Sequence, residues 1–287
     1  MKQFLILILG LISSQLIASD SIPSFVVKKM EGEIKIDGDL SEPQWSNADY
    51  AKDFYEWFPN DTSLAKHPTE IYMFYDDEFL YVGIKCYSSS NNFIINTLRR
   101  DYRAGGMDNI TLLLDPFNDR TNAFIFGINP LGVVREGLLS NGGQSNDDFN
   151  MAWDNKWVGD AQIHDDYWGA EMKIPFKIMT FKEGMKSWGL GSYRFDTQNN
   201  EIHTWLNIPR NQRLYSLAFM GEMIWEEPLE KAGKSLAFIP YTAASTQKNF
   251  EENTKQNFVD CVSNSNFWQI FQIQNFNLAF EYFYNKL

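Results

Sequence analysis

Five residues of this chain place aromatic faces and charged hydrogen-bonding groups in polar stretches of sequence. Arg99, Arg100 and Asp101 come shortly before two glycines, and Trp153 and Trp157 lie in the polar segment 140–157. Aromatic faces pack against the axial C–H groups of a pyranose ring, and charged groups form the stronger hydrogen bonds to its hydroxyls. These five residues are therefore the candidate carbohydrate-binding residues. The alternatives are loop anchors or core for the tryptophans and a solvated ion pair for the charged residues.

A second set of residues offers oxygen ligands for a cation. Asp115, Asn118 and Asp119 fall in one predicted loop, and Asp147 and Asp148 fall in the segment 140–157. Because Ca²⁺ binds carboxylate and amide oxygens, a structural calcium is one interpretation of these positions. The other is an acidic turn without a metal, since Asn and Asp also stabilise turns through their own side chains.

The sequence favours a non-catalytic protein. It contains no H-E-x-x-H, no G-x-S-x-G and no glycine-rich phosphate loop. His67, His164 and His203 are scattered, without metal-ligand spacing. A glycosidase needs two carboxylates about 5 to 9.5 Å apart across a cleft, whereas Asp165 and Asp166 are adjacent in a predicted hairpin and point to opposite sides. The net charge of -12 argues against a nucleic-acid partner, because phosphate binding needs clustered Lys and Arg.

The candidate residues flank a predicted hairpin. In residues 109–115, Ile110, Leu112 and Leu114 fall on one face, and residues 123–129 alternate in the same way. Period-two alternation is typical of a half-buried strand, and Pro116 with the Asn and Asp that follow it predicts a hairpin loop. Together with the segments before and after it, this hairpin belongs to a set of about ten short predicted strands at near-regular spacing, which is typical of a sandwich or barrel.

Several predictions concern the other elements. Residues 25–36 are predicted to be an edge segment, and residues 41–44 resemble a capping box that opens a short helix. Cys86 shares a strand face with apolar neighbours, which favours a buried free thiol over a disulfide to Cys261. The tryptophans in strand or helix patterns are predicted to be core residues: Trp45, Trp168, Trp188 and Trp205.

Both ends of the chain are predicted to lie outside the main domain. Residues 1–19 have a short positive start, an apolar stretch and a small-residue cleavage point after Ala18, so they predict a signal peptide and an exported protein. The charged segment 226–233 contains Pro and Gly, which places the end of the core domain, residues 20–227, near Glu227. Residues 235–245 and 276–284 alternate like transmembrane β-strands. We therefore expect residues 228–287 to be a linker and a truncated β-rich tail, the start of an outer-membrane β-barrel, with residues 249–266 poorly ordered.

Four short motifs occur in order: IDGDLSEPQW at 36–45, DDEFLYV at 76–82, DNITLLLD at 108–115 and WGL at 188–190. In this order and spacing they resemble the family 9 carbohydrate-binding module, in the branch that heads exported bacterial proteins with an outer-membrane-barrel-like C-terminal region. The resemblance covers roughly residues 25–226. It implies an antiparallel β-sandwich, binding of plant-type polysaccharide or oligosaccharide, a structural calcium, and an association with glycoside hydrolases in carbohydrate catabolism.

The sequence departs from this family at the sugar clamp. Sugar-binding members hold the sugar between two Trp, the first lying three residues before the Asp that opens the central strand, where this chain has Gly105. The second precedes the last strand, where this chain has Leu214 and Tyr215. Three functions follow: a non-catalytic carbohydrate-binding domain, an interaction domain of an outer-membrane protein that has lost the sugar site, and an accessory module of a glycoside hydrolase.

Overall fold

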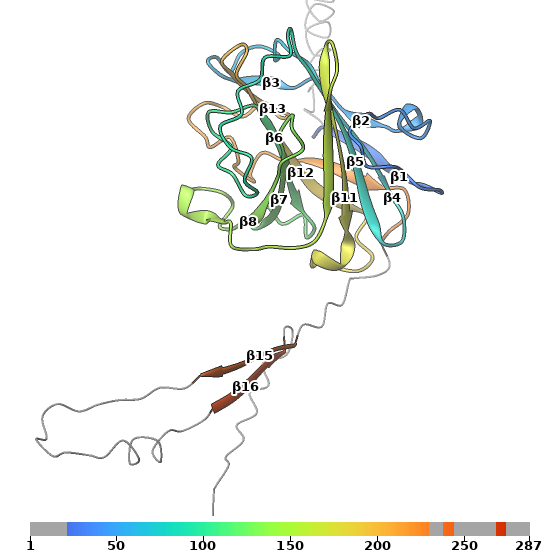
Figure 1. Ribbon diagram of the computed structural model, residues 1–287, viewed down its shortest axis with the longest axis vertical. Helices are drawn as coiled ribbons and strands as arrows, with labels where there is room; N and C mark the ends of the chain where they lie inside the picture. Colours follow the sequence, from blue (N-terminus) through green and yellow to red (C-terminus); the bar gives the residue numbers. More distant parts are fainter. Residues whose placement is uncertain (1–21, 230–237, 244–267, 274–287) are drawn as a thin grey trace, which may run out of the picture. The chain divides into compact units, whose positions relative to one another are not determined.

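The computed structural model describes residues 22–229 and, as backbone alone, the strands at 238–243 and 268–273 (Figure 1). The chain divides into two compact units, residues 1–233 and 234–287. The predicted signal peptide, Cys261 and the segments 249–266 and 276–284 lie outside the described residues. The domain boundary near Glu227 stays a prediction.

The first unit is a β-sandwich of two sheets (Figure 1). The first sheet has the order β14, β12, β6, β7, β8, β9, with β13 beside one end of β12 and β3 beside β13. Its strands are β3 (Tyr55–Phe58), β6 (Asn109–Asp115), β7 (Ala123–Ile128), β8 (Val134–Leu139), β9 (Phe149–Asn150), β12 (Ser187–Asp196), β13 (Glu201–Thr204) and β14 (Gly221–Trp225). The second sheet consists of β2 (Tyr50–Ala51), β4 (Thr69–Tyr75), β5 (Phe79–Tyr87), β10 (Val158–Ile163) and β11 (Tyr167–Pro175).

One strand, β1 (Ser24–Lys29), joins the two sheets. Its first part pairs with β14 and its last two residues pair with β4, in both cases in parallel. The prediction of an edge segment was therefore wrong, because both parts of the strand are paired and Phe25 and Val27 are buried. All other ladders in the described part of this unit are antiparallel, as expected.

The predicted central hairpin is confirmed. β6 and β7 pair with Ile110 opposite Ile128 and Leu114 opposite Phe124, so the apolar faces coincide. The expectation of a half-buried strand was wrong for β6, which is buried along its whole length. Its second face is covered because the chain between β13 and β14 packs residues such as Leu217 against it.

The main core lies between the two sheets. It contains the inward-facing side chains of β4, β5, β6, β11 and β12, and Cys86 is a buried free thiol within it. The four tryptophans predicted as core are buried: Trp45, Trp168, Trp188 and Trp205. Burial of large aromatic side chains dominates core energetics, which explains why this part of the sequence pattern predicts the fold well.

The first motif is fixed by a buried acid of the second sheet. Glu171 Oε2 accepts hydrogen bonds from the backbone N–H groups of Asp37 and Gly38, both at 2.9 Å, and its Oε1 accepts one from Trp45 Nε1 at 2.8 Å. Burial raises the pKa of Glu171 against the effect of these donors. A 3₁₀ turn, η1 (Trp45–Asn47), replaces the predicted capped helix, and its N-cap residue, Gln44, makes no side-chain capping bond.

The remaining described elements are short. Two further 3₁₀ turns, η2 (Asn146–Asp148) and η3 (Phe176–Ile178), lie in the first unit. In the second unit β15 (Phe238–Ala243) pairs antiparallel with β16 (Trp268–Ile273). Among the described residues no helix has the length and apolar character needed to cross a membrane.

Candidate functional site

The strand β8 sends two consecutive charged residues to opposite faces of its sheet. Alternate side chains of a strand point in opposite directions, so Arg135 and Glu136 point away from each other. Glu136 is completely buried and Arg135 is 4% exposed. These two residues organise two separate polar clusters, one on each face.

The Glu136 cluster contains three of the five predicted carbohydrate-binding residues, Arg100, Asp101 and Trp157. Its carboxylate accepts hydrogen bonds from the Arg100 guanidinium, from Trp157 Nε1 and from the backbone N–H of Asn155, the last at 2.9 Å. The backbone N–H of Glu136 donates to Asp101 Oδ1 at 3.1 Å. Through these hydrogen bonds the cluster ties the two predicted loops to β8.

The aromatic residues of this cluster present little surface. Trp157 is only 7% exposed and packs edge-on against Phe126, with ring centroids 5.2 Å apart. Trp153 is half-buried and packs against Phe124 at 5.2 Å. Arg99 is exposed, and its backbone N–H donates to Thr97. A sugar-binding role for Trp153, Trp157, Arg99 and Arg100 stays a prediction; only Asp101 of the five borders the depression described next.

On the other face of the sheet Arg135 borders a depression of about 540 Å³. The two loops predicted to share a site meet here, because Asp101 to Gly105 and the chain around Asn146 both contribute. β12 supplies the middle of the lining and the chain before β14 supplies its far wall. The lining residues are Asp101, Tyr102, Arg103, Ala104, Gly105, Arg135, Asn146, Phe149, Met151, Tyr193, Phe195, Leu214 and Tyr215.

The guanidinium of Arg135 has no acidic partner. Its Nη1 donates to the hydroxyl of Tyr193 at 3.4 Å, its Nη2 lies 3.8 Å from the sulfur of Met151, and its Nε has no hydrogen-bond partner. No carboxylate among the described residues forms an ion pair with it. A buried charge is costly unless it is paired, so this side chain is available to oxygen acceptors of a ligand.

Tyr102 adds a second unpartnered group beside Arg135. The Arg135 guanidinium lies 5.7 Å from the ring centroid of Tyr102, close enough for a cation–π contact. The Tyr102 hydroxyl is buried without a hydrogen-bond partner, and burial raises its pKa. The hydroxyl therefore stays neutral and can donate or accept a hydrogen bond.

The two positions to which the family resemblance assigns the Trp clamp border this same depression. Gly105 lies on one side, and Leu214 and Tyr215 lie on another. A Cβ built on Gly105 meets nothing within 4 Å, so its side of the depression is open. Phe149 contacts Tyr215 edge-on, with ring centroids 4.6 Å apart. Tyr215 and Phe149 thus form an aromatic part of the lining of this depression.

The residues predicted to bind calcium are occupied with hydrogen bonds of their own. Asp115 is fully buried, and its two oxygens accept backbone N–H groups of Phe117 at 3.1 Å and Arg120 at 2.6 Å. Asp119 Oδ1 accepts the N–H of Thr121 at 2.8 Å. The amide of Asn118 donates to Ser187 and Glu222. These contacts fix the β6–β7 turn, and a calcium ion at these residues stays a prediction.

Asp147 and Asp148, the other acidic positions, are the second and third residues of η2. Asp148 Oδ2 accepts N–H groups of Gln144 and Ser145 at 2.8 and 2.7 Å, and the N–H of Asp147 donates to Ser145 Oγ at 3.1 Å. This is a capping box. The hydrogen bonds from Asn141 and the Ser145 backbone lower the pKa of Asp148. The carboxylate therefore positions the loop that carries Asn146 to the depression.

Sequence reasoning missed the residues at the centre of this site. Arg135 stands in the stretch VREGLL, which has no apolar alternation to mark it as buried. It is buried because its stem lies over Gly127, where a Cβ would come within 2.7 Å of Arg135 Cγ. The glycine in β7 is the one sequence signal that could have indicated a close approach.

Comparisons with known proteins identify the fold. No protein-family model and no curated protein matches this sequence. Among solved structures, a family 9 carbohydrate-binding module from Caldicellulosiruptor kristjanssonii in complex with cellotriose is similar, with a TM-score of 0.51 and 14% identity over 71% of this chain and 94% of that chain. Its complex with glucose gives the same TM-score and identity, over 71% and 96% of the chains.

A third structure supports the same fold. A candidate carbohydrate-binding protein from Bacteroides uniformis is similar with a TM-score of 0.56 and 14% identity, over 72% of this chain and all of that chain. The first unit of this protein therefore has the β-sandwich fold of family 9 carbohydrate-binding modules, as the four motifs predicted.

Proposed function

We propose that the first unit is a non-catalytic carbohydrate-binding domain and that the depression beside Arg135 receives the sugar. The observation that carries this proposal is the buried guanidinium of Arg135, which forms no ion pair with any residue in the described part of the chain and borders a depression with aromatic walls. The same depression contains Gly105 and Tyr215, the positions of the sugar clamp in related modules. Its position in the fold and its chemistry therefore favour the same class of ligand.

The ligand class follows from the lining. Tyr215 and Phe149 offer apolar ring faces or edges for the C–H surface of a pyranose, and Arg135 and the Tyr102 hydroxyl offer hydrogen bonds to its oxygens. The related module that binds cellotriose and glucose makes short plant-type oligosaccharides the first ligands to test. With one aromatic wall and a few hydrogen bonds, we expect a Kd of about a micromolar to a millimolar, or about -8 to -4 kcal/mol.

The predicted residues on the other face of β8 receive a supporting role in this proposal. Arg100 and Trp157 hold Glu136, and Asp101 connects that cluster to the border of the depression. Arg99 and Trp153 retain enough exposure to contact a longer chain that continues past the rim. In that case their replacement would weaken binding of long oligosaccharides more than binding of a disaccharide.

Calorimetric titration of the full chain with xylo- and cello-oligosaccharides tests the proposal. Arg135→Met keeps the aliphatic stem and removes the charge, and Arg120→Met, at an exposed arginine outside the depression, is the matched control on the surface. We expect saturable binding by the wild type that Arg135→Met weakens at least about tenfold, which is about 1.4 kcal/mol. Because replacing a buried charge by an apolar side chain is often neutral or stabilising, we expect the thermal midpoint of Arg135→Met to stay unchanged or to rise. Equal binding by Arg135→Met and the wild type would refute the assignment of the site.

The wider role is also proposed from the sequence. The signal-peptide pattern of residues 1–19 supports export to the periplasm, outer membrane or cell surface, where polysaccharide capture would serve carbohydrate catabolism. An accessory role beside a glycoside hydrolase fits the same site. The replacement of the Trp clamp by Gly105 and by Leu214 with Tyr215 favours a second candidate, an interaction domain attached to an outer-membrane barrel. Failure of the wild type to bind any plant-type glycan, in solution or in a pull-down on insoluble xylan and cellulose, would support that candidate instead.

A further inference from the structure

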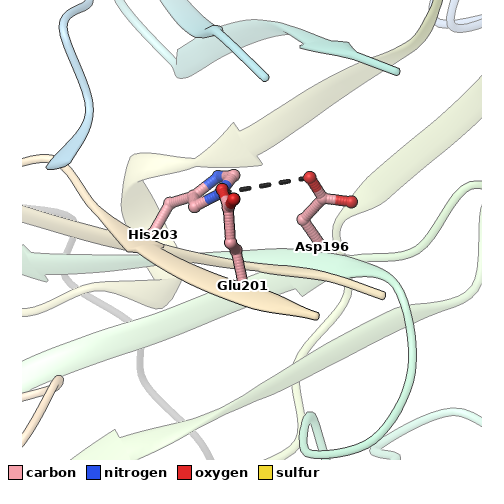
Figure 2. Close-up of side chains that lie close together, drawn as sticks. All are labelled: Asp196, Glu201 and His203. Atoms are coloured by element: carbon pink, nitrogen blue, oxygen red, sulfur yellow. Dashed lines mark hydrogen bonds and ion pairs between the residues drawn. The ribbon is translucent and has the colours of Figure 1, made fainter. Parts of the chain in front are cut away.

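A separate cluster of imidazole and carboxylate groups lies where β12 meets β13 (Figure 2). The two strands pair with Asp196 opposite Glu201 and with Arg194 opposite His203. Since alternate residues of a strand share a face, Glu201 and His203 point to the same side, and the end of β12 brings Asp196 beside them. The ligand atoms of Asp196, Glu201 and His203 all lie within 4.8 Å of one another.

Distances within this group are close to those of a metal site. His203 Nε2 lies 2.8 Å from Glu201 Oε2 and 4.0 Å from Asp196 Oδ2. Four ligands at about 2.0 to 2.1 Å from a tetrahedral ion are about 3.3 Å apart. Shifts of less than about 1 Å in side-chain atoms would therefore place these three atoms around one cation.

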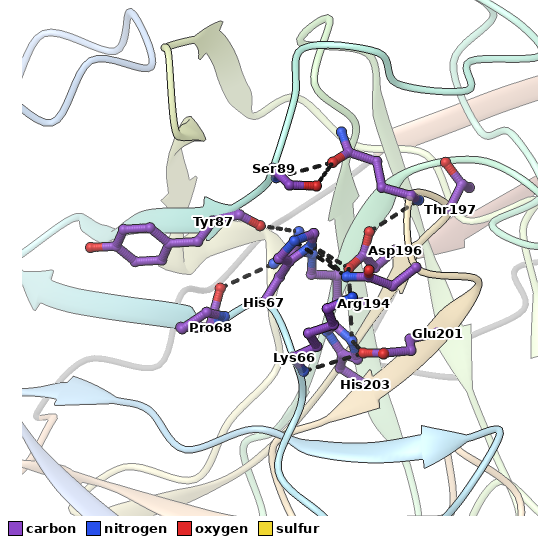
Figure 3. Close-up of polar contacts among 12 residues, drawn as sticks. Lys66, His67, Pro68, Tyr87, Ser89, Arg194, Asp196, Thr197, Glu201 and His203 are labelled. Carbon is purple, nitrogen blue, oxygen red and sulfur yellow. Dashed lines mark hydrogen bonds and ion pairs between the residues drawn. The ribbon is translucent and has the colours of Figure 1, made fainter.

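A second imidazole lies next to one member of this group. His67 lies just before β4, and its Nδ1 is 2.7 Å from the same Asp196 Oδ2 that faces His203 (Figure 3). The amide of Asn199 also reaches this oxygen, at 3.0 Å. His67 belongs to the second sheet's side of the sandwich and the other three residues to the first sheet, so the cluster spans the two.

The cluster is enclosed, and its ligands are oriented by further hydrogen bonds. His203 and Asp196 are 0% and 1% exposed. The backbone N–H of Lys66 donates to Glu201 Oε2 at 3.2 Å, and that of Gln198 donates to Asp196 Oδ1 at 3.2 Å. Such contacts are typical of metal sites, where they fix the ligands that touch the ion.

The charges leave room for a cation. The carboxylates of Asp196 and Glu201 have one guanidinium near them, that of Arg194. Its Nη groups donate to Pro68 O, Thr69 Oγ1 and Tyr87 O and not to the two carboxylates.

Access to the cluster comes from one side. A depression of about 370 Å³ reaches Asp196 and Glu201, and its walls include Thr197, Asn200 and Phe58. An ion can therefore reach the carboxylates without unfolding of the sandwich.

We propose that His67, Asp196, Glu201 and His203 form a binding site for one divalent transition-metal ion of the Zn²⁺ type. Two imidazole nitrogens and two carboxylate oxygens suit Zn²⁺, which takes four N, O or S ligands in a tetrahedron. They do not suit Ca²⁺, which takes six to eight oxygens. With no open position, the ion would serve as a structural clip between the loop before β4 and the β12–β13 hairpin.

Metal titration of the full chain tests this site. The chain is stripped with a chelator and titrated with ZnCl₂ by calorimetry, with CaCl₂ and MgCl₂ as comparison ions. We expect one Zn²⁺ per chain and a thermal midpoint that rises by about 5 to 10 °C when free Zn²⁺ is about a hundred times its Kd. His203→Gln and His67→Gln should each weaken Zn²⁺ binding at least about a hundredfold, since even contacts behind the ligands matter by 10- to 100-fold.

Two controls exclude binding elsewhere. His164→Gln removes the third histidine of the chain, which is stacked on Tyr167 away from the cluster, and should leave affinity and stoichiometry unchanged. Cys261→Ser, which removes a thiol outside the described residues, should behave in the same way. Zn²⁺ binding that survives both His67→Gln and His203→Gln, no saturable binding by the wild type, or an equal thermal shift with Ca²⁺ would overturn the proposal.

X-ray absorption of the Zn²⁺-loaded wild type covers the case in which the histidine variants do not fold. The proposal predicts four ligands with the scattering of about two imidazole rings. A shell made of oxygen alone, or one containing sulfur, would contradict it.

Discussion

Restoring an aromatic residue at position 105 should strengthen sugar binding. Gly105 borders the depression beside Arg135, and a Cβ built there meets nothing within 4 Å. Its backbone does not lie in the left-handed region that would strain an L side chain. Gly105→Trp should therefore be accommodated without rearrangement, with a change in the free energy of unfolding of about 0.5 kcal/mol or less.

The expected gain in affinity is about tenfold. An indole that covers one face of a pyranose removes about 60 Å² of apolar surface from water, worth about 1.5 kcal/mol at 25 cal/mol per Å². Specific ring geometry adds about 1 kcal/mol, and ordering the new side chain costs about 1 kcal/mol. The net of about 1.5 kcal/mol corresponds to a factor of about ten in Kd.

The assay is calorimetric titration of the full chain with cellotriose and xylotriose, accompanied by indole fluorescence, which reports contact of the new ring with the sugar. Gly105→Ala controls for the loss of glycine flexibility. Leu131→Trp places an indole at another exposed position, since Leu131 is 53% exposed, and controls for nonspecific adhesion.

If Gly105→Trp stays folded and leaves the Kd unchanged, the sugar does not bind in the depression that Gly105 borders. A gain shared equally by Leu131→Trp would also count against it, because the effect would then come from surface aromaticity and not from the depression. A gain that disappears in the double variant with Arg135→Met would link the two sides of the site.

Three further predictions concern stability. Burial raises the pKa of Glu171 above 4.5, so the stability that this group contributes is complete at low pH and is lost as the pH rises through the raised pKa. Urea titrations at several pH values should therefore show that the wild type loses stability relative to Glu171→Gln over that range. A pH-independent difference between the two proteins would contradict this. Trp157→Phe removes a hydrogen-bond donor to buried Glu136 and should lower the free energy of unfolding in urea by about 1 to 3 kcal/mol. The Kd for short oligosaccharides should stay unchanged. A higher Kd in this variant would indicate that Trp157 contacts the sugar. Gly38→Ala should lower the free energy of unfolding in urea by at least about 1 to 3 kcal/mol, because Gly38 has a φ of +84° and a Cβ at this position would lie 2.5 Å from Ala161 Cα. Unchanged stability would show that the two backbones are farther apart in solution than in the structure.

Much of the fold could be predicted because its strands are marked by apolar alternation. The pairing of β6 with β7 and the burial of Trp168 and Trp188 follow from side chains whose burial is favourable in almost any arrangement. The role of β1 could not be predicted, since a strand shared between two sheets has the same alternation as an edge strand. The capping pattern at residues 41–44 was misleading because Glu171, distant in sequence, takes over the positioning of Trp45.

The candidate sites depended on contacts that sequence alone does not specify. Arg135 is indistinguishable from a surface arginine until Gly127 lies beneath it. The two predicted loops do meet, as expected, but the alternation of β8 separates Trp157 from the depression. His67 and His203 looked scattered because strand register, and not spacing along the chain, brings both to Asp196. Local patterns thus predicted which loops meet, and tertiary packing decided which of their side chains line the depression.

The most direct test of the proposed carbohydrate-binding site is a crystal structure of the protein soaked with cellotriose or xylotriose. The account predicts a sugar ring in the depression, against Tyr215, with a sugar oxygen within about 3.2 Å of an Arg135 Nη atom. A sugar seated against Trp153 on the opposite face of β8, or an empty depression in a crystal of protein that binds the same sugar in solution, would contradict it.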